Sequence, residues 1–526
     1  MSIALINLCK PTYSLEDPNV VNLTLAITFD RNINPEDYYI LLTHETSGQS
    51  IELSGEIVDY DEANPKYKKK HPSQRHWHVT FDEIECGERY TYQIKHINNQ
   101  PIYLLPNYLE AKAGISEKPH MPISFKAPPS KSTKFGKVRL MFGGDTEALN
   151  FLPLGIDKFF AKLLGLNFDQ RVISSSNYSI IERGEYDLAL HLGDYINGEK
   201  IKGFQYKGIE KIDEARKALE SDHHAIVRGA LGGIVSARLS EDHDGIGNGY
   251  DADTVNEKPM AFQNLCAASH ECWPVPSNPE SPNFGLYYQL DYGPISIWCL
   301  HTRAFHHPGQ TLLGEEQTKW FKSSLAQSEA SIKIVATPVP FAMGKNPNED
   351  FRQNADEHYD ILKTCAMHDV DMIVSADTHA YGMMKFVIHL EDGSTAEIPH
   401  YMVGTLGGKP QQMTKAELKL MPNPLLPEKH AELFQGSKVY AYYCASLMSK
   451  RWPKSKNQAM LYNESEDEIK WLGKEVQLNA YGHLEVEIDY EEASILSMFK
   501  AICKKDSKQR PFFEHQTSIS YHPKTP

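Results

Sequence analysis

The sequence has no apolar run that approaches the roughly 20 residues of a membrane-spanning helix. It also lacks a basic N-terminal start followed by a long apolar stretch, so no signal peptide is predicted. These two absences exclude the common helical membrane proteins and the usual exported ones. We therefore expect a cytoplasmic protein, with leaderless secretion as the alternative.

Basic residues are outnumbered by acidic ones, and the formal net charge is −15. A nucleic-acid or anionic-membrane partner would require a basic face, so the charge balance argues against both. An anionic substrate stays compatible with this charge, because a bound metal ion can reverse the field of an acidic pocket.

The eight cysteines are scattered, and none has CxxC spacing. Several lie in apolar, strand-like runs such as SIWCL. We expect free buried thiols in a reducing compartment rather than disulfides.

The features that are present divide the 526 residues into several parts. Residues 1–115 contain alternating segments such as VNLTLAITF and predict a small β-sandwich. Residues 116–136 are rich in Pro, Ser and Lys and predict a linker. Residues 137–500 carry short continuous apolar runs separated by helix-like segments, which is typical of a layered α/β domain. Residues 501–526 have no periodicity and are predicted to be a tail.

Several of the short apolar runs end in acidic or imidazole side chains. In α/β sheets, ligands gather at the carboxyl ends of strands, and here those ends supply Asp145, Asp194, Asp242, Asp377 and His379. Converging carboxylates would repel by about 4 kcal/mol per close pair at an effective dielectric constant of 20, so bound cations are predicted. Oxygen and imidazole donors without thiolate suit Mn, Fe, Zn, Mg or Ca.

The run EDHDGIGNGYDAD follows one of these strands and has two other readings. A solvated acidic loop is one, and an EF-hand calcium loop is the other. An EF-hand requires glycine at its sixth position and glutamate at its twelfth. Counting from Asp242, the glycine is fourth and the twelfth residue is Asp253, which excludes an EF-hand.

Two neighbouring residues point to specific roles in a metal centre. Gly193 immediately precedes Asp194 and allows a tight turn that would bring its carboxylate into a crowded site, as a ligand bridging two metals requires. His243 lies beside Asp242 and could reach a leaving group while its neighbour binds metal. We therefore interpret the acidic run as one wall of a metal centre.

The motifs HLGDYI, EDHDGIGNGYDAD, TLLGEEQTKWF and SADTHA resemble, in this order, the PhoD-like alkaline phosphatases and phosphodiesterases, a branch of the calcineurin-like metallophosphoesterases. LYYQLDYGPISIWCLHTR and KPMAFQNLCAASHECWPVP support the resemblance, which covers roughly residues 137–410. It implies an N-terminal β-sandwich followed by a four-layer αββα metallophosphoesterase domain with C-terminal insertions.

The resemblance also implies roles for individual residues. His243 would assist departure of the leaving group, and Arg303 would contact phosphate. Asn248 is a further candidate in the same loop. The implied metal ligands are Asp145, Asp194, Asp242, Asp377 and His379.

Four positions depart from the family pattern. Asp145 follows Gly144 where the family often has Ser-Cys. Asn197 replaces a tyrosine ligand, His301 replaces an aspartate, and Thr337 stands where the wider superfamily commonly has a metal-binding histidine.

The resemblance implies a hydrolase of phosphate esters, acting on monoesters, diesters or both through a pair of metal ions. The cations would be Mn, Fe or Zn, with Ca or Mg as alternatives, and the substrate a phosphorylated small molecule or another phosphoester. A decayed phosphatase fold that acts as a scaffold is the alternative prediction. A third is that the N-terminal β-sandwich recruits a protein partner on which the enzyme acts.

Overall fold

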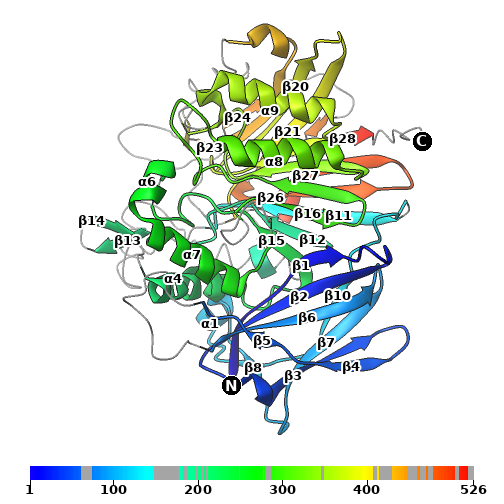
Figure 1. The fold of residues 1–526 in the computed structure, drawn as a ribbon, viewed down its shortest axis with the longest axis vertical. Coiled ribbons are helices and arrows are strands. Elements are labelled where there is room, and N and C mark those ends of the chain that lie inside the picture. Colours follow the sequence, from blue (N-terminus) through cyan, green and yellow to red (C-terminus); the bar gives the residue numbers. More distant parts are fainter. Residues whose placement is uncertain are drawn as a thin grey trace.

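A computed structural model gives the fold of the chain (Figure 1). The structure describes residues 1–60, 74–134, 136–146, 177–179, 181, 186–196, 199–202, 205–208, 211–247, 249–276, 278, 286–344, 349–406, 412–413, 429–446, 459–462, 469–471, 478–503 and 509–518.

The largest sheet has thirteen strands and runs through the N-terminal and central parts of the chain. In spatial order its main path is β25 (Ile469–Trp471), β28 (Gln509–Ser518), β27 (Ser494–Cys503), β26 (Leu478–Asp489), β11 (Lys137–Gly143), β12 (Leu188–His191), β15 (Leu231–Arg238), β1 (Ser2–Tyr13), β2 (Val20–Phe29), β6 (His76–Glu85) and β5 (Glu56–Ile57), with β8 (Tyr103–Leu104) paired to β1 and β9 (Lys118–Pro119) paired to β8. Strands β11, β12, β15 and β1 are parallel.

A second large sheet has nine strands. Its order is β16 (Tyr288–Tyr292), β17 (Ile295–Cys299), β18 (Ile332–Thr337), β19 (Met372–Ser375), β21 (Thr395–Met402), β20 (Tyr381–His389), β23 (Lys438–Ser446) and β22 (Gln412–Met413), with β24 (Ala459–Tyr462) paired to β23. Strands β17, β18, β19 and β21 are parallel. Each large sheet therefore has four parallel strands at its centre, flanked by antiparallel ones.

Two smaller sheets and a set of helices complete the described structure. The sheets are β10 (Ile123–Lys126), β7 (Arg89–His96), β3 (Tyr38–His44) and β4 (Ser50–Leu53) in one, and β13 (Glu199–Lys202) and β14 (Gln205–Gly208) in the other. The helices are α1 (Tyr108–Lys112), α4 (Ile212–Ala218), α5 (Ala225–Val227), α6 (Ala252–Glu257), α7 (Pro259–Cys272), α8 (Gly314–Gln327) and α9 (Ala355–Met367), with η1 (Pro35–Asp37), η3 (Leu219–His224), η4 (Phe351–Gln353) and η5 (Ala431–Phe434) as short 3₁₀ or π turns. None of the described helices is long and apolar enough to cross a membrane.

The side chains of the central strands alternate between two apolar cores. Leu190 of β12 packs in the same core as Ile334 and Ala336 of β18, between the two large sheets. Their neighbours Ala189 and Val335 point the other way, into the core that includes the helices. Figure 1 shows α8 and α9 on one face of the nine-stranded sheet. Strands covered on both faces need continuous apolar runs, and the predicted layered α/β fold is confirmed.

The N-terminal strands join the central architecture instead of standing apart from it. β1 pairs in parallel with β15, and β2 and β6 extend the same sheet. The four-stranded sheet packs on this extension, where Phe81 and Phe125 stack with ring centroids 5.6 Å apart. The N-terminal sandwich thus shares one of its two sheets with residues 137–500. The reason lies in β1, which has eight consecutive buried residues and therefore suits a central strand.

Two predicted segments differ from the structure. Residues 116–136, predicted as a linker, contain β9 and β10, and Phe125 of β10 is buried. Residues 501–526, predicted as a tail, include β28, which pairs with β27 in the large sheet. Composition misled in both cases, because Pro, Lys and Ser obscured strands that pair with β7 and with β27.

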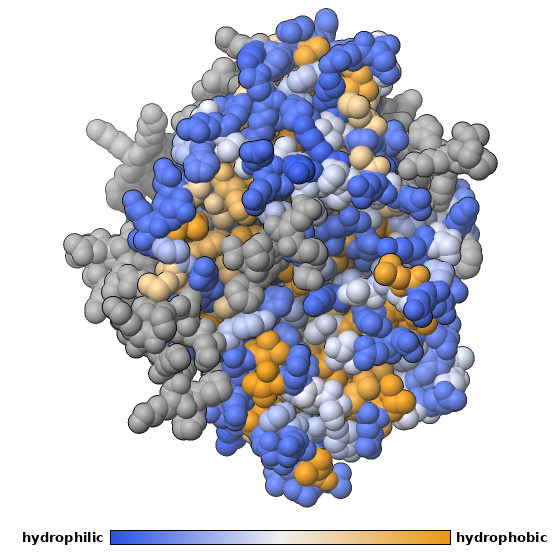
Figure 2. All heavy atoms as spheres, in the orientation of Figure 1, coloured by the Kyte–Doolittle hydropathy of each residue, from blue (hydrophilic) through white to orange (hydrophobic). Residues whose placement is uncertain are grey.

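The large exposed apolar side chains gather in the N-terminal part of the chain. Figure 2 shows apolar patches in the lower half of this face, where Figure 1 places the N-terminal strands. The five exposed examples from this part are Leu15, Ile51, Ile97, Ile115 and Met121. The predicted protein partner for this region stays a prediction.

Candidate metal centre

The predicted ligands lie in loops that follow parallel strands of both large sheets. Asp145 follows β11, Asp194 follows β12 and Asp242 follows β15, while Asp377 and His379 follow β19. A parallel bridge between Gly144 and Thr405 joins the two sheets at this edge. Loops that are far apart in sequence therefore meet at one edge of the paired sheets.

Asp145, Asp194 and His379 form the first group of side chains that could hold a cation. Their ligand atoms lie within 4.8 Å of one another. Nε2 of His379 is 3.4 Å from Oδ1 of Asp145. This group combines one loop from each of three strands, two in the thirteen-stranded sheet and one in the nine-stranded sheet.

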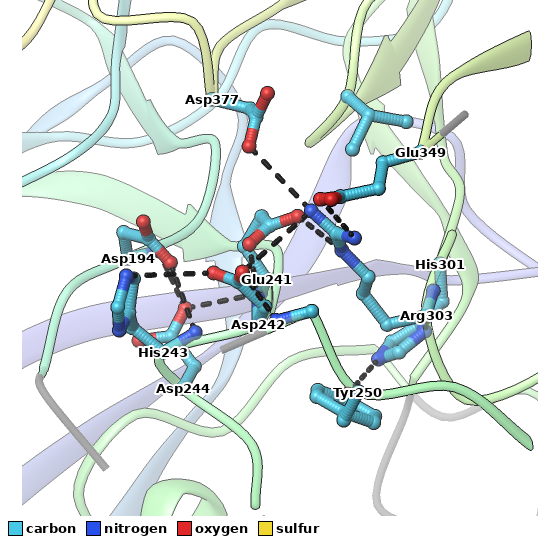
Figure 3. A network of polar contacts seen from close by, with 12 residues as sticks. Asp194, Glu241, Asp242, His243, Asp244, Tyr250, His301, Arg303, Glu349 and Asp377 are labelled. Atoms are coloured by element: carbon cyan, nitrogen blue, oxygen red, sulfur yellow. Dashed lines mark hydrogen bonds and ion pairs between the residues drawn. The ribbon is translucent and has the colours of Figure 1, made fainter. Parts of the chain in front are cut away.

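A second group consists of Asp194, Asp242 and His243, whose ligand atoms also lie within 4.8 Å of one another. Nε2 of His243 is 3.8 Å from Oδ1 of Asp242, and the backbone N–H of His243 donates to Oδ1 of Asp194 at 3.3 Å. Asp194 belongs to both groups, and Figure 3 shows its carboxylate beside Asp242 and His243.

Four of the predicted ligands have a left-handed backbone. The φ angles are 52° at Asp145, 58° at Asp194, 64° at Asp377 and 54° at His379. Non-glycine residues adopt this region at an energetic cost, and such residues concentrate at functional sites. The backbone is thus turned so that these side chains point away from their strands and toward the shared edge.

The turn before Asp194 depends on its glycine, as predicted. Gly193 has a φ of 115°, and a Cβ at this position would lie 2.5 Å from Cβ of Glu241. Any larger residue would therefore push the loops of β12 and β15 apart.

The side chains present fit a metal ion. Asp145 is 1% exposed, and among the described residues no donor forms a hydrogen bond with either of its carboxylate oxygens. A buried carboxylate without donors is costly. A cation would satisfy both oxygens, and the donor set of carboxylates and imidazoles is the one expected for such an ion.

Asp244 organises the two metal-facing loops, although the sequence analysis gave it no role. Its carboxylate accepts backbone N–H groups from Asp194 at 2.6 Å, Tyr195 at 2.8 Å, Ile196 at 3.0 Å and Glu241 at 3.1 Å. Burial raises the pKa of Asp244 to about 7, and these donors act in the opposite direction. The sequence feature that could have identified Asp244 is its position two residues after Asp242, within the same acidic run.

We expect Asp244→Asn to destabilise the protein by about 3 kcal/mol, because an amide cannot accept at both ends and would leave buried N–H groups unsatisfied. Metal affinity should fall about 10- to 100-fold as the Asp194 loop loosens. Denaturant unfolding and metal titration measure the two effects.

Asp251→Asn provides the matched control for Asp244→Asn. Asp251 caps α6 by accepting the N–H of Thr254 at 2.9 Å, and asparagine caps helices about as well as aspartate. Equal stability and metal affinity in both variants would show that Asp244 does not organise the loops.

Arg303 is surrounded by carboxylates. Its side chain is 1% exposed; Nε donates to Glu241 at 2.5 Å, and Nη2 is 3.5 Å from Asp377 and 3.7 Å from Asp242. Nη1 donates to Glu349 at 3.2 Å. Burial opposes the charged form, yet Glu241, Asp242 and Asp377 raise the pKa of Arg303 well above its ordinary value. Arg303 therefore links the candidate metal ligands to each other (Figure 3).

Asp377 lies toward Arg303 instead of inside either three-residue group. Burial raises its pKa to about 7, and Arg303 acts in the opposite direction. Asp242 and Asp145 are close enough to raise it further. Asp377 thus borders the same cluster of charge, and its role as a metal ligand stays a prediction.

Two of the positions that depart from the family pattern have clear local roles. Nδ1 of His301 accepts the N–H groups of Arg303 at 3.3 Å and Ala304 at 3.2 Å, as an aspartate carboxylate could. The hydroxyl of Thr337 donates to the carbonyl of Val339 at 3.0 Å, within its own turn. Asn197 and Asn248 lie outside the described residues.

A third group, Asp59, His76 and Glu271, also has ligand atoms within 4.8 Å of one another. Here Nε of Arg216 donates to Glu271 at 2.8 Å, and Nδ1 of His76 lies 2.5 Å from Asp59. Because a guanidinium already neutralises this group, we interpret it as an ion-pair network that joins α4 and α7 to the N-terminal strands.

Comparison with known proteins gives a match over part of the chain. Residues 240–399 match the family model described as PhoD-like phosphatase. This range includes Asp242, His243, Arg303, Asp377 and His379. No curated protein sequence matches the chain.

Two solved structures resemble the fold. One is described as the structure of PhoD, with a TM-score of 0.61 and 13% identity, and the match covers 98% of this chain and 90% of that chain. The other is purple acid phosphatase PPD1 from yellow lupin (Lupinus luteus) seeds, with a TM-score of 0.55 and 12% identity, covering 98% of this chain and 75% of that chain. At these identities the likeness concerns the fold.

Proposed function

We propose that this chain hydrolyses phosphate esters at a centre of two metal ions. The premise is that it carries a PhoD-like phosphatase domain and is a metal-dependent phosphoesterase. The two ligand groups that share Asp194 carry this proposal. A carboxylate between two cation sites is the arrangement found in dinuclear hydrolases, whose metals lie about 3.5–4 Å apart.

Asp145, Asp194 and His379 would hold one cation, and Asp194 and Asp242 the other, with Asp377 at the border of the centre. When bound, the two cations would supply Lewis-acid stabilisation of phosphoryl charge and activation of water. Carboxylate and imidazole ligands suit Mn, Fe or Zn best, with Ca or Mg as alternatives.

The remaining side chains would act on substrate. His243, 17% exposed at the side chain, would donate a proton to the departing alkoxide from Nε2 or position the group that does. Its alternative role is that of a ligand, because it belongs to the second group. Arg303 would stabilise charge on a phosphoryl oxygen while it keeps Asp242 and Asp377 in place.

Elemental analysis of protein purified without chelator should find about two metal ions per chain. The same protein, reconstituted in turn with Mn, Fe, Zn, Ca and Mg, should hydrolyse p-nitrophenyl phosphate, bis(p-nitrophenyl) phosphate or both. Removal of metal with a chelator should abolish turnover, because the cations would activate the attacking water and supply most of the stabilisation of phosphoryl charge. Fewer than one metal per chain, with no turnover, would favour the scaffold alternative.

A further inference from the structure

We propose that Glu349 makes this centre select monoanionic phosphodiesters over dianionic phosphomonoesters. The inference rests on the proposed function, since it concerns the substrate class of that same site. The carboxylate of Glu349 lies against Nη1 of Arg303. A phosphoryl oxygen that binds Nη1 would therefore meet a negative charge there.

The nitrogen atoms of the Arg303 guanidinium differ in the carboxylates that they contact. Nε and Nη2 face Glu241 and Asp242, which are buried, and Asp377, whose side chain is 27% exposed. In the described structure, Nη1 contacts Glu349 at 3.2 Å. Nη1 is therefore the guanidinium nitrogen at which an incoming anion would meet Glu349.

Of the four carboxylates that contact Arg303, that of Glu349 could be displaced most readily by a substrate. Its side chain is 39% exposed, whereas those of Asp377, Asp242 and Glu241 are 27%, 7% and 1% exposed. Solvent screens the Glu349 carboxylate more than the other three, so its pair with Arg303 is the one most weakened by water. A substrate phosphoryl group could displace Glu349 from Nη1, while the buried Glu241 and Asp242 would stay.

The residues after Glu349 hold its backbone beside the centre. Arg352 pairs with Asp350 through Nε at 3.0 Å and donates to the carbonyl of Gly344 at 2.8 Å. Phe351 stacks on Phe341 with ring centroids 3.9 Å apart. Glu349 is thus an exposed charge on a well-anchored turn, so its carboxylate stays near Nη1 even when displaced.

The negative charge of Glu349 beside Arg303 would repel an ester with two negative charges more strongly than an ester with one. A phosphomonoester has a second pKa near 6 and is a dianion at pH 8, whereas a diester is a monoanion. One additional negative charge about 6 Å from a carboxylate, at a dielectric constant of about 40, corresponds to roughly a tenfold loss of affinity. Both esters compete with Glu349 for Nη1, but the dianion is also repelled more strongly.

The experiment compares wild type with Glu349→Gln at pH 8, using metal-loaded protein and both p-nitrophenyl phosphate and bis(p-nitrophenyl) phosphate. We expect kcat/KM for the monoester to rise about tenfold more than that for the diester, mainly through a lower KM. Glu349→Asp, which keeps the charge, should keep the wild-type selectivity. An equal change for both esters, or no change, would overturn the proposal.

Glu329→Gln is the matched control. Glu329 is exposed and precedes β18, at the opposite end of that strand from the metal-facing loops. The same charge change there should leave both esters unaffected, and an equal shift in selectivity would overturn the proposal. Metal content is measured in every variant, and loss of metal in Glu349→Gln would overturn it by assigning Glu349 to the centre itself.

Binding measurements separate this inference from the proposed function. If wild type hydrolyses neither ester with any metal, the proposed function fails, and calorimetry then compares inorganic phosphate, a dianion at pH 8, with dimethyl phosphate, a monoanion. Glu349→Gln should bind inorganic phosphate about tenfold more tightly relative to dimethyl phosphate than wild type does. An unchanged ratio would overturn the role of Glu349.

Discussion

Replacement of Asp194 by asparagine is expected to remove bound metal and to lower p-nitrophenyl phosphate turnover by about 1,000-fold or more. Asp194 belongs to both ligand groups, so one substitution removes a negative charge from two cation sites. Changes to residues that merely support ligands cost about 10- to 100-fold, and a shared ligand should cost more. Metal content and steady-state kinetics measure the two effects.

Asp187→Asn, at the opposite end of β12 from Asp194, is the control. Asp187 precedes β12 and accepts the backbone N–H of Arg139 at 2.8 Å, a bond that asparagine can also accept. We expect full metal content in that variant. Full turnover and full metal content in Asp194→Asn would contradict the shared role of this carboxylate and with it the dinuclear mechanism.

The second large effect concerns Arg303, and it should depend on metal. Arg303→Met leaves Glu241, Asp242 and Asp377 without their common cation, and removal of one partner from a buried charge pair costs about 3–5 kcal/mol. We expect that loss in metal-free protein. With metals bound, Asp242 and Asp377 would have other cations beside them, and the loss should be smaller.

Urea unfolding of both proteins, each with and without metal, gives the two free-energy differences. Arg139→Met is the control, because Arg139 is 38% exposed and pairs with Glu487 at 3.0 Å. A half-exposed pair should contribute no more than about 1 kcal/mol in either state. Equal losses for Arg303→Met with and without metal would show that Arg303 does not balance the ligand carboxylates.

Much of the candidate site could be predicted because its residues share a local signature. Asp145, Asp194, Asp242 and Asp377 each follow a short apolar run, and a run of that kind ends at a sheet edge. Because these strands are parallel, their carboxyl ends lie at the same edge of the sheet, and the side chains that follow them come together. Whether these side chains bind metal stays a prediction until metal content is measured.

Other features depend on contacts that no local pattern records. Glu349 precedes a 3₁₀ turn and has no motif around it, so its contact with Arg303 is visible only in three dimensions. β10 lies in a segment whose composition suggests a linker, but its pairing with β7 fixes it as a strand. Asp244 could be predicted in part. Its position within the acidic run is visible in the sequence, but its four N–H partners come from two loops and are not.

The pairing of β1 with β15 bears on how the chain folds. Asn7 lies opposite Leu231 in this pair, so the strand that leads to Asp242 gains its neighbour from a very distant part of the polypeptide. Parallel pairing over such separations has a high loop-closure cost and slows folding. Until β1 docks, this edge of β15 lacks its partner strand, and open strand edges invite self-association.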